Sequence, residues 1–388
     1  MRIAIVHDYL HQYGGAEKVV EKWLQMYPQA DVFTSFITPE TFLDSKEIIM
    51  AYQENRIHTT WLQRFIPRFI QFYKHFYWIY PITMSRVTVK NYDLVLISST
   101  YCAKNVQYQN CAKLIHYCHS PTRFLHGLVT ETDHKTLNPI LRFLIPIINW
   151  PLKWMDLKAV HYLNENKCQW VANSNFIQRT IQDVYNTKSE VIYPPIEIDK
   201  FLKAQKSTLP KEYFLSHGRI SFHKRIDLAI QACIKSNKKL FISGSSAFLE
   251  EFKKLKNLVA LAEKKDPSKK GLIKFLGRTS DEEYIELLRK AEGFLFPGKE
   301  DFGITPIEVL ASGTPIIAYK SGGALEYIVD QKNGIFFEEQ NISSITHALK
   351  RFEKTKFNSK IIKESAMPFS SKKFEESIKQ LILEINKR

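Results

Sequence analysis

The sequence predicts an α/β protein built from two doubly wound parallel-sheet domains. Short apolar runs of strand length alternate with helix-length stretches from Arg2 to Phe337, the pattern of repeated strand–helix units. With 388 residues, 44% of them hydrophobic, the chain is long enough for two cores. Pro194-Pro195 interrupts both helix and sheet, so we place the domain boundary there. We expect domains over 1–194 and 195–368, followed by a terminal helix over 369–388.

The amino-acid composition limits which kinds of binding partner and which cellular compartment suit the protein. The formal charge of +15 favours an acidic partner, and nucleic acid, anionic lipid and sugar nucleotides all qualify. We expect no nucleic-acid binding, because the chain carries no recognised nucleic-acid module. Five cysteines without paired CxxC spacing indicate a reducing compartment and no zinc site. The apolar run at the N-terminus is too short for a signal peptide, and no run approaches the roughly 20 residues that span a bilayer. We therefore predict a cytoplasmic protein, either free or peripheral on the inner face of a membrane.

Two features of the first half lie where open α/β sheets bind ligands. Gly14 and Gly15 follow the first strand and open a helix, where glycines let the backbone approach a diphosphate. The GxGxxG fingerprint is absent, so an ordinary helix-entry turn explains this pair equally well. His119 directly follows the apolar strand Lys113 to Cys118, at the end of the sheet that binds ligands. A lone histidine there is also commonly structural.

Residues 55–92 contain six basic residues and no acidic one. Aromatic residues recur there at helical spacing, with Arg64 and Arg68 beside them. Either a core-packing helix with a solvated basic side or an interfacial helix pressed onto an anionic membrane fits this pattern. The stretch 139–155 is apolar, aromatic and broken by three prolines, which predicts either a lid or a second membrane-contacting element. The aromatic residues at helical spacing are Trp61, Phe65, Phe69, Phe72 and Phe76.

The second half places two cations after its first strand, Tyr213 to His217. Arg219 and Lys224 lie on the short loop between that strand and the helix that follows. Two cations on such a loop suit a diphosphate, although a surface basic cluster is common in so basic a chain. Two further apolar strands, Leu240 to Ser243 and Ile273 to Leu276, also end in glycine loops, at Gly244 and Gly277.

The most informative stretch is 296–327, FPGKEDFGITPIEVLASGTPIIAYKSGGALEY. Pro306 suits the first turn of a helix and Gly313 its end, so a helix N-terminus with unpaired amides should lie near Gly303 and bind phosphate. Glu300 and Glu308 flank this turn and could accept hydrogen bonds from sugar hydroxyls. Helix capping alone would explain one glutamate, but it requires neither the second nor the Gly-Gly turn that follows.

This stretch resembles the E-x7-E region of retaining nucleotide-sugar glycosyltransferases of family 4. Those enzymes have the GT-B architecture, in which two Rossmann-like domains face a central cleft. Two further segments, HDYL...GGAEKVV and GR....KR, resemble the same family. YCHSPTRFL resembles the YCHTPMRYLWD segment of its mannosyltransferases of polysaccharide and lipopolysaccharide assembly, and departs from it at His126-Gly127, where those relatives carry Trp-Asp.

The resemblance implies a hexosyltransferase that moves mannose from GDP-mannose to a hydroxyl of a glycan or lipid-linked acceptor. We see no Asp-x-Asp motif, so we expect activity without a divalent metal or any other cofactor. Glu300 and His119 would act at the transferred sugar, and Glu308 would hold the ribose. The alternatives are the same reaction with a UDP-sugar, a nucleotide-sugar epimerase, and a catalytically silent membrane-bound adaptor. The resemblance assigns the rest of the donor site to Gly14, Gly15, Arg219, Lys224, Gly303, Ile304 and Thr305.

Overall fold

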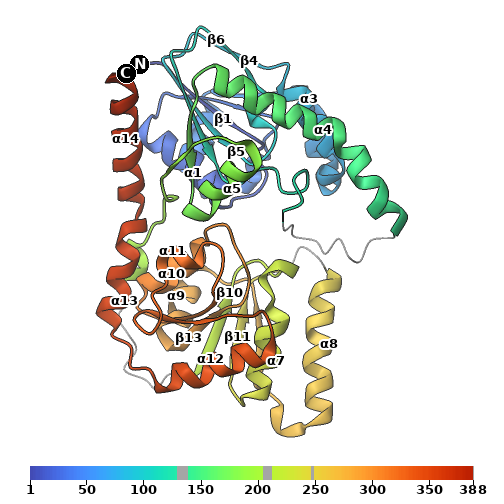
Figure 1. The fold of residues 1–388 in the computed structure, drawn as a ribbon, viewed down its shortest axis with the longest axis vertical. Coiled ribbons are helices and arrows are strands. Elements are labelled where there is room, and N and C mark those ends of the chain that lie inside the picture. Colours follow the sequence, from blue (N-terminus) through green and yellow to red (C-terminus); the bar gives the residue numbers. More distant parts are fainter. Residues whose placement is uncertain (129–138, 204–211, 246–248, 388) are drawn as a thin grey trace. The chain divides into compact units, whose positions relative to one another are not determined.

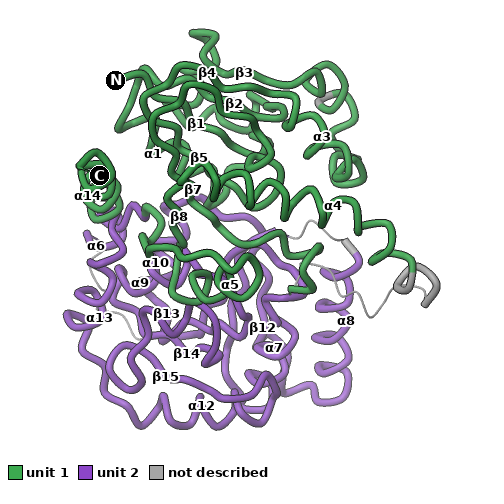
Figure 2. The backbone as a smooth tube through the Cα atoms, turned by 45° about the horizontal axis from the view of Figure 1, so that its top comes forward, with its two compact units in different colours: residues 1–129, 134–195, 371–388 green, residues 130–133, 196–370 purple. Residues whose placement is uncertain are grey.

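The computed structural model describes residues 1–128, 139–203, 212–245 and 249–387 (Figure 1). These residues form two compact units (Figure 2). Unit 1 contains the described residues up to Pro195 together with 371–387, and unit 2 contains those from Ile196 to Ser370. Within the described ranges, no helix is long and apolar enough to cross a membrane.

Unit 1 is built on a seven-stranded parallel sheet in the order β3-β2-β1-β5-β7-β8-β9. The two central strands, β1 and β5, are buried at every position because both faces of the sheet are covered. A separate parallel pair joins β4 (Thr88–Lys90) to β6 (Gln107–Gln109). The strands of the main sheet are β1 (Ile3–His7), β2 (Asp31–Thr34), β3 (Ile57–Thr59), β5 (Leu94–Ser99), β7 (Lys113–Cys118), β8 (Gln169–Ala172) and β9 (Glu190–Val191).

Alternate side chains of β1 enter two hydrophobic cores. Ala4 and Val6 belong to one core cluster, whereas Ile3 and Ile5 belong to the other. The last helix packs into the second cluster through Phe374 and its neighbours on the same face. The helices of unit 1 are α1 (Gly15–Met26), α2 (Lys46–Gln53), α3 (Tyr80–Met84), α4 (Pro139–Glu165), α5 (Asn175–Tyr185) and α14 (Ser371–Lys387).

Unit 2 is built on a six-stranded parallel sheet in the order β12-β11-β10-β13-β14-β15. The strands are β10 (Tyr213–His217), β11 (Leu240–Ser243), β12 (Ile273–Gly277), β13 (Ala291–Phe296), β14 (Ile316–Tyr319) and β15 (Gly334–Phe337). The helices are α6 (Asp199–Leu202), α7 (Ile226–Lys235), α8 (Leu249–Lys265), α9 (Asp281–Lys290), α10 (Ile304–Ala311), α11 (Ala324–Tyr327), α12 (Ile342–Lys354) and α13 (Ser359–Ala366).

The strand order reverses once in each unit, between β1 and β5 and between β10 and β13. Helices that follow strands on opposite sides of such a point leave towards opposite faces, so the loops there are splayed and open to ligands. The prediction of two doubly wound parallel sheets is confirmed.

Two local expectations were wrong. The aromatic stretch is not one α-helix but two short 3-10 segments, η2 (Trp61–Arg64) and η3 (Ile66–Ile79), the second interrupted by non-helical backbone at Phe69 and Phe76. The stretch 139–155 is not broken, because α4 continues through both Pro146 and Pro151. Each of these prolines removes one intrahelical hydrogen bond, and the burial of the inner face of α4 offsets that loss.

Candidate functional site

In unit 2, the loops that follow β10 and β13 touch each other at the point where the strand order reverses. A Cβ atom built on Gly298 would lie 2.7 Å from the carbonyl oxygen of His223 and 2.8 Å from the Cα of Lys224. Real Cβ atoms do not approach backbone so closely, so only glycine fits while the loops remain in contact. The predicted phosphate loop and the predicted sugar-binding loop are therefore neighbours.

Lys224 and Glu300 form an ion pair across this contact. Their side chains are only 17% and 18% exposed, so the pair is partly shielded from water. Thr305 is part of the same cluster, because a Cβ on Gly218 would lie 3.9 Å from Lys224 Nζ and 4.0 Å from Thr305 Oγ1. The structure thus brings together residues predicted to hold the phosphates and the sugar.

The amino end of α10 lies beside this pair. Gly303 precedes the helix with φ of +94°, a conformation that favours glycine, and a Cβ there would lie 2.8 Å from Tyr327 Oη. Tyr327 donates a hydrogen bond to the carbonyl oxygen of Phe302 at 2.9 Å and so fixes the turn. Ile304 and Thr305 belong to the first turn of α10, where backbone N–H groups have no intrahelical acceptor and a partial positive charge accumulates.

The Gly322-Gly323 turn holds the Glu300 loop in place. The Gly323 N–H donates to the carbonyl oxygen of Glu300 at 2.8 Å. Cβ atoms on Gly322 and Gly323 would lie 2.3 Å from the Glu300 oxygen and 2.1 Å from the Phe302 oxygen. The second glycine turn, which capping could not explain, therefore positions the loop that carries the carboxylate.

Glu308 lies one turn into α10 and is half-buried. Together with burial, its charge raises the pKa of Tyr284. The Tyr284 ring stacks on His217, with centroids 3.7 Å apart, and His217 Nδ1 lies 3.0 Å from Ser243 Oγ. Burial, helped by the charge of Lys224, lowers the pKa of His217 to about 4. Our sequence analysis missed this ring pair, although His217 ends a strand just as His119 follows one.

Arg219 lies exposed on the loop after β10, next to Gly218, whose φ is +120°. Two residues of that same loop, Ser221 and His223, hydrogen-bond to each other at 3.1 Å. The loop after β10 thus carries two cations, of which Arg219 is exposed and Lys224 is partly shielded from water.

In unit 1, Gly14 and Gly15 lie at the amino end of α1. The φ of Gly14 is −123°, which any residue adopts, and its N–H donates to Glu17 Oε2 at 3.0 Å. An added Cβ would meet only that carboxylate, at 3.1 Å. Gly14 is thus less constrained than the glycines of unit 2, and Glu17 satisfies an amide of the helix start.

His119 belongs to a hydrogen-bonded chain at the carboxyl end of the sheet. Its Nε2 lies 2.8 Å from Ser98 Oγ, which lies 3.0 Å from His7 Nδ1. Burial and the charge of His7 lower the pKa of His119 to about 3, so its imidazole is neutral near pH 7. For His7, burial favours the neutral ring, but hydrogen bonding and charge from Glu17 outweigh it and raise the pKa.

Asp8 organises the loop beside this chain, and our sequence analysis assigned it no role. Its carboxylate accepts hydrogen bonds from Ser99 Oγ at 3.0 Å, from the Thr100 N–H at 2.7 Å and from the Ala103 N–H at 2.7 Å. Burial by itself would raise the pKa of Asp8. The charge of His7 and the hydrogen bonds from these amides outweigh burial and lower the pKa, so Asp8 stays ionised. Its position one residue past β1 was the available signal.

The departure from the mannosyltransferase segment has a structural explanation. His126 Nε2 lies 2.9 Å from Asp156 Oδ2, and Lys104 Nζ lies 2.7 Å from Asp156 Oδ1. Tyr185 donates a further hydrogen bond to the same carboxylate at 2.8 Å. His126 therefore completes a buried polar cluster that ties α4 to α5 and to the segments that follow β5 and β7.

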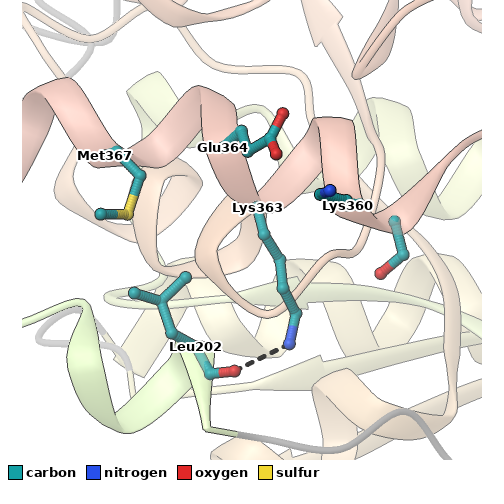
Figure 3. Close-up of a pocket in the computed structure, with 6 residues that line it drawn as sticks. Leu202, Lys360, Lys363, Glu364 and Met367 are labelled. Atoms are coloured by element: carbon teal, nitrogen blue, oxygen red, sulfur yellow. Dashed lines mark hydrogen bonds between the residues drawn. The ribbon is translucent and has the colours of Figure 1, made fainter.

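A surface pocket of about 520 Å³ lies elsewhere in unit 2, between α6 and α13 (Figure 3). Lys363 points across it and donates to the carbonyl oxygen of Leu202 at 2.8 Å (Figure 3). None of the predicted site residues lines it. Across the part of the chain that the structure describes, no group of three or more His, Cys, Asp or Glu side chains is arranged to hold a metal ion.

Comparison with solved structures identifies the architecture. The fold is similar to that of Anabaena HepE in complex with UDP, with a TM-score of 0.64 at 16% identity over 99% of this chain and 100% of that one. The two parallel sheets therefore form a GT-B fold, as predicted.

Residues 197–367 match the family model "Glycosyl transferases group 1". An uncharacterized glycosyltransferase of Methanocaldococcus jannaschii is 28% identical over 220 residues, covering 50% of this chain and 54% of that protein. The alpha-1,3/1,6-mannosyltransferase ALG2 of Kluyveromyces lactis is 26% identical over 286 residues, covering 62% and 53%. The chain thus spans about half the length of these curated relatives. The part of the chain that matches the group 1 glycosyl transferases, 197–367, lies within unit 2.

Proposed function

We propose that the protein transfers a hexose, mannose from GDP-mannose, to a hydroxyl group of a glycan or lipid-linked acceptor, with retention at the anomeric carbon. The observation that carries this proposal is the cluster of Lys224, Glu300 and the amino end of α10. It combines a partly shielded cation, a carboxylate and the first-turn amides of a helix within one small site. A nucleotide diphosphate sugar needs these three groups.

The chemistry requires stabilisation of the departing diphosphate. The bond between the anomeric carbon and the diphosphate oxygen breaks, the acceptor oxygen forms the new bond on the same face, and the acceptor proton passes to the diphosphate. Lys224, Arg219 and the amides of Ile304 and Thr305 supply fixed positive charge for the leaving group, which is the most effective form of such stabilisation. No divalent metal is needed for this step.

The ion pair suggests how donor binding assembles the sugar site. Because Lys224 is the counter-ion of Glu300, a diphosphate that engages Lys224 would take over that role. The Glu300 carboxylate would then be available to accept hydrogen bonds from sugar hydroxyls. Glu308, one turn into α10, would accept those of the ribose, beside the His217–Tyr284 ring pair.

We assign His119 of unit 1 to the transferred sugar. A neutral imidazole fits this role, since it can donate or accept a hydrogen bond without repelling positive charge at the anomeric carbon. Gly14 and Gly15 would line the diphosphate through the backbone at the start of α1. We also propose a cytoplasmic location, where sugar nucleotides and reduced cysteines occur together.

The similarity to ALG2, an alpha-1,3/1,6-mannosyltransferase, supports the mannose donor. A UDP-sugar is the second candidate, because the HepE structure contains UDP. Incubation of the protein with GDP-mannose and UDP-glucose in EDTA, with glycan and lipid-linked acceptors present to receive the hexose and release of free GDP or UDP as the readout, separates the two. Release of GDP alone supports the proposal, release of UDP alone replaces the donor, and release of neither overturns the transferase assignment.

A further inference from the structure

Unit 1 exposes an unusual number of large apolar side chains on neighbouring elements. Phe65 and Phe69 are each 53% exposed, although both lie in a stretch that also reaches the core. The inner side of this stretch is anchored by Leu62 and Ile66, which are buried in the first core cluster. The outward aromatic residues of η2, η3 and the turn between them are Trp61, Phe65, Phe69, Phe72 and Trp78. The core-packing interpretation of this stretch therefore fails for most of its aromatic residues.

Helix α4 has a second apolar stripe on its solvent side. Its inner face buries Leu152, Asp156 and Leu163. Its outer stripe follows spacings of three, four and three residues, so it occupies one side of the helix, roughly opposite the buried face. The outer stripe consists of Ile147, Trp150, Trp154 and Leu157, of which Trp150 is 68% exposed.

These two elements lie side by side. Tyr77 of η3 donates a hydrogen bond to Asn149 Oδ1 of α4 at 2.9 Å. Leu62, Ile66 and Leu152 belong to the same core cluster. Helix α3, which directly follows η3, also runs beside α4 (Figures 1 and 2). The outward residues of η2, η3 and α4 therefore form one surface of unit 1, which we call the aromatic surface.

The charges around the aromatic surface are of one sign. No acidic residue occurs over 55–92, and Arg64 and Arg68 are exposed beside the aromatic residues. On α4, the single carboxylate before Glu165 is Asp156, which is buried and paired with Lys104. The outer side of α4 carries Lys153 and Lys158 instead, and Lys158 Nζ lies 5.1 Å from the centre of the Trp154 ring.

We propose that the aromatic surface docks on an anionic lipid bilayer. Tryptophan and phenylalanine rings favour the boundary between headgroups and acyl chains, and arginine and lysine bind lipid phosphates. A patch that is apolar and basic matches such a surface by charge and by polarity. Docking is independent of the proposed donor chemistry, and a lipid-linked acceptor would lie in the same membrane.

The test is flotation of the purified full chain with vesicles, without any nucleotide. We expect binding to vesicles of phosphatidylcholine mixed with phosphatidylglycerol, and at least ~10-fold weaker binding to phosphatidylcholine alone. The pair Trp150→Ser and Trp154→Ser should weaken binding by ~10-fold or more, and Arg64→Glu with Arg68→Glu should do the same and remove the salt dependence.

Matched controls come from α8 of unit 2. Leu261 is 67% exposed, and Lys253 and Lys254 are exposed. Leu261→Ser, and Lys253→Glu with Lys254→Glu, should leave vesicle binding unchanged. Unaltered thermal unfolding of the aromatic-surface variants keeps loss of binding distinct from loss of folding.

Three outcomes would overturn the proposal. The first is wild-type protein that stays with the lipid-free fraction, and the second is equal binding to both kinds of vesicle. The third is a wild-type dimer that the Trp150 and Trp154 substitutions dissociate while vesicles have no effect. That last result would assign the aromatic surface to a second copy of the chain. Failure of the nucleotide assay with intact vesicle binding would affect the proposed function alone.

Discussion

The points where the strand order reverses in the two units occupy equivalent places in their sheets but differ in chemistry. In unit 2, the loops carry Arg219, Lys224 and Glu300, and glycines allow the backbones of neighbouring loops to lie in close contact. In unit 1, His7 at the end of β1 is joined through Ser98 of β5 to His119, which follows the neighbouring strand β7. The same topology thus carries an ion pair beside an exposed arginine in one unit and a histidine–serine–histidine chain in the other, so the side chains and not the fold define the chemistry.

The largest effect on activity is expected when the carboxylate of the unit 2 cluster is removed. Glu300→Gln should reduce turnover on the order of 100-fold, because one preorganised contact to the sugar is lost. Affinity for GDP or UDP should be retained or rise, since Lys224 loses its competing partner. Kinetics and calorimetry on the same preparation measure both quantities.

Glu338→Gln is the matched control, because Glu338 forms an exposed ion pair with Lys320. It should change neither turnover nor nucleotide affinity. Full activity of Glu300→Gln would remove Glu300 from the sugar site.

A second comparison contrasts the glycines of the two units. Gly323→Ala should destabilise the protein by about 3 kcal/mol, because its Cβ would lie 2.1 Å from the Phe302 oxygen and the backbone must shift. Gly14→Ala should cost less than about 1 kcal/mol, because only the Glu17 carboxylate needs to move. Urea unfolding of both variants measures the difference, and equal costs would contradict the account of the tight loops.

The smallest effect concerns the histidines of unit 1. Burial, with the charge of Lys104, lowers the pKa of His116 to about 3, so the folded state keeps this ring neutral. Its stabilising contribution is present above the unfolded pKa of about 6.5 and is lost as the pH falls from there towards 3. Between pH 7.5 and pH 5, the wild type should lose about 2 kcal/mol more stability than His116→Leu.

His161 provides the control for that comparison, because its side chain is 74% exposed and pairs with Glu165. His161→Leu should follow the pH dependence of the wild type. If His116→Leu does so as well, His116 is not kept neutral by the fold.

The sequence predicted the fold class well, because buried parallel strands and amphipathic helices leave distinct apolar patterns. It also predicted that the loops of Lys224 and Glu300 carry function, since both follow strands at the ligand end of a sheet. It could not predict their ion pair, which joins residues 76 positions apart. The His217–Tyr284 stack was missed for the same reason.

The aromatic stretch shows a different limit. A 3.6-residue pattern predicted one helix, but Pro67 would lie inside a helix that began at Trp61, where it cannot donate a backbone hydrogen bond, and the chain forms 3-10 segments instead. Periodicity also could not decide between core and surface, because an apolar stripe looks the same in both settings. In α4, by contrast, the prolines suggested a break that tertiary packing overrides.

The most direct test of the central claim, a nucleoside diphosphate bound at Lys224, is calorimetric titration of GDP and UDP in EDTA. We predict that one of the two binds the wild type and that Lys224→Ala weakens this binding ~100-fold, since a charge-assisted hydrogen bond contributes about 3 kcal/mol. Lys238→Ala, which removes a partly shielded lysine paired with Glu353 at the amino end of β11, should bind as the wild type does. Equal affinity of Lys224→Ala and the wild type, or no binding of either nucleotide, would contradict the account.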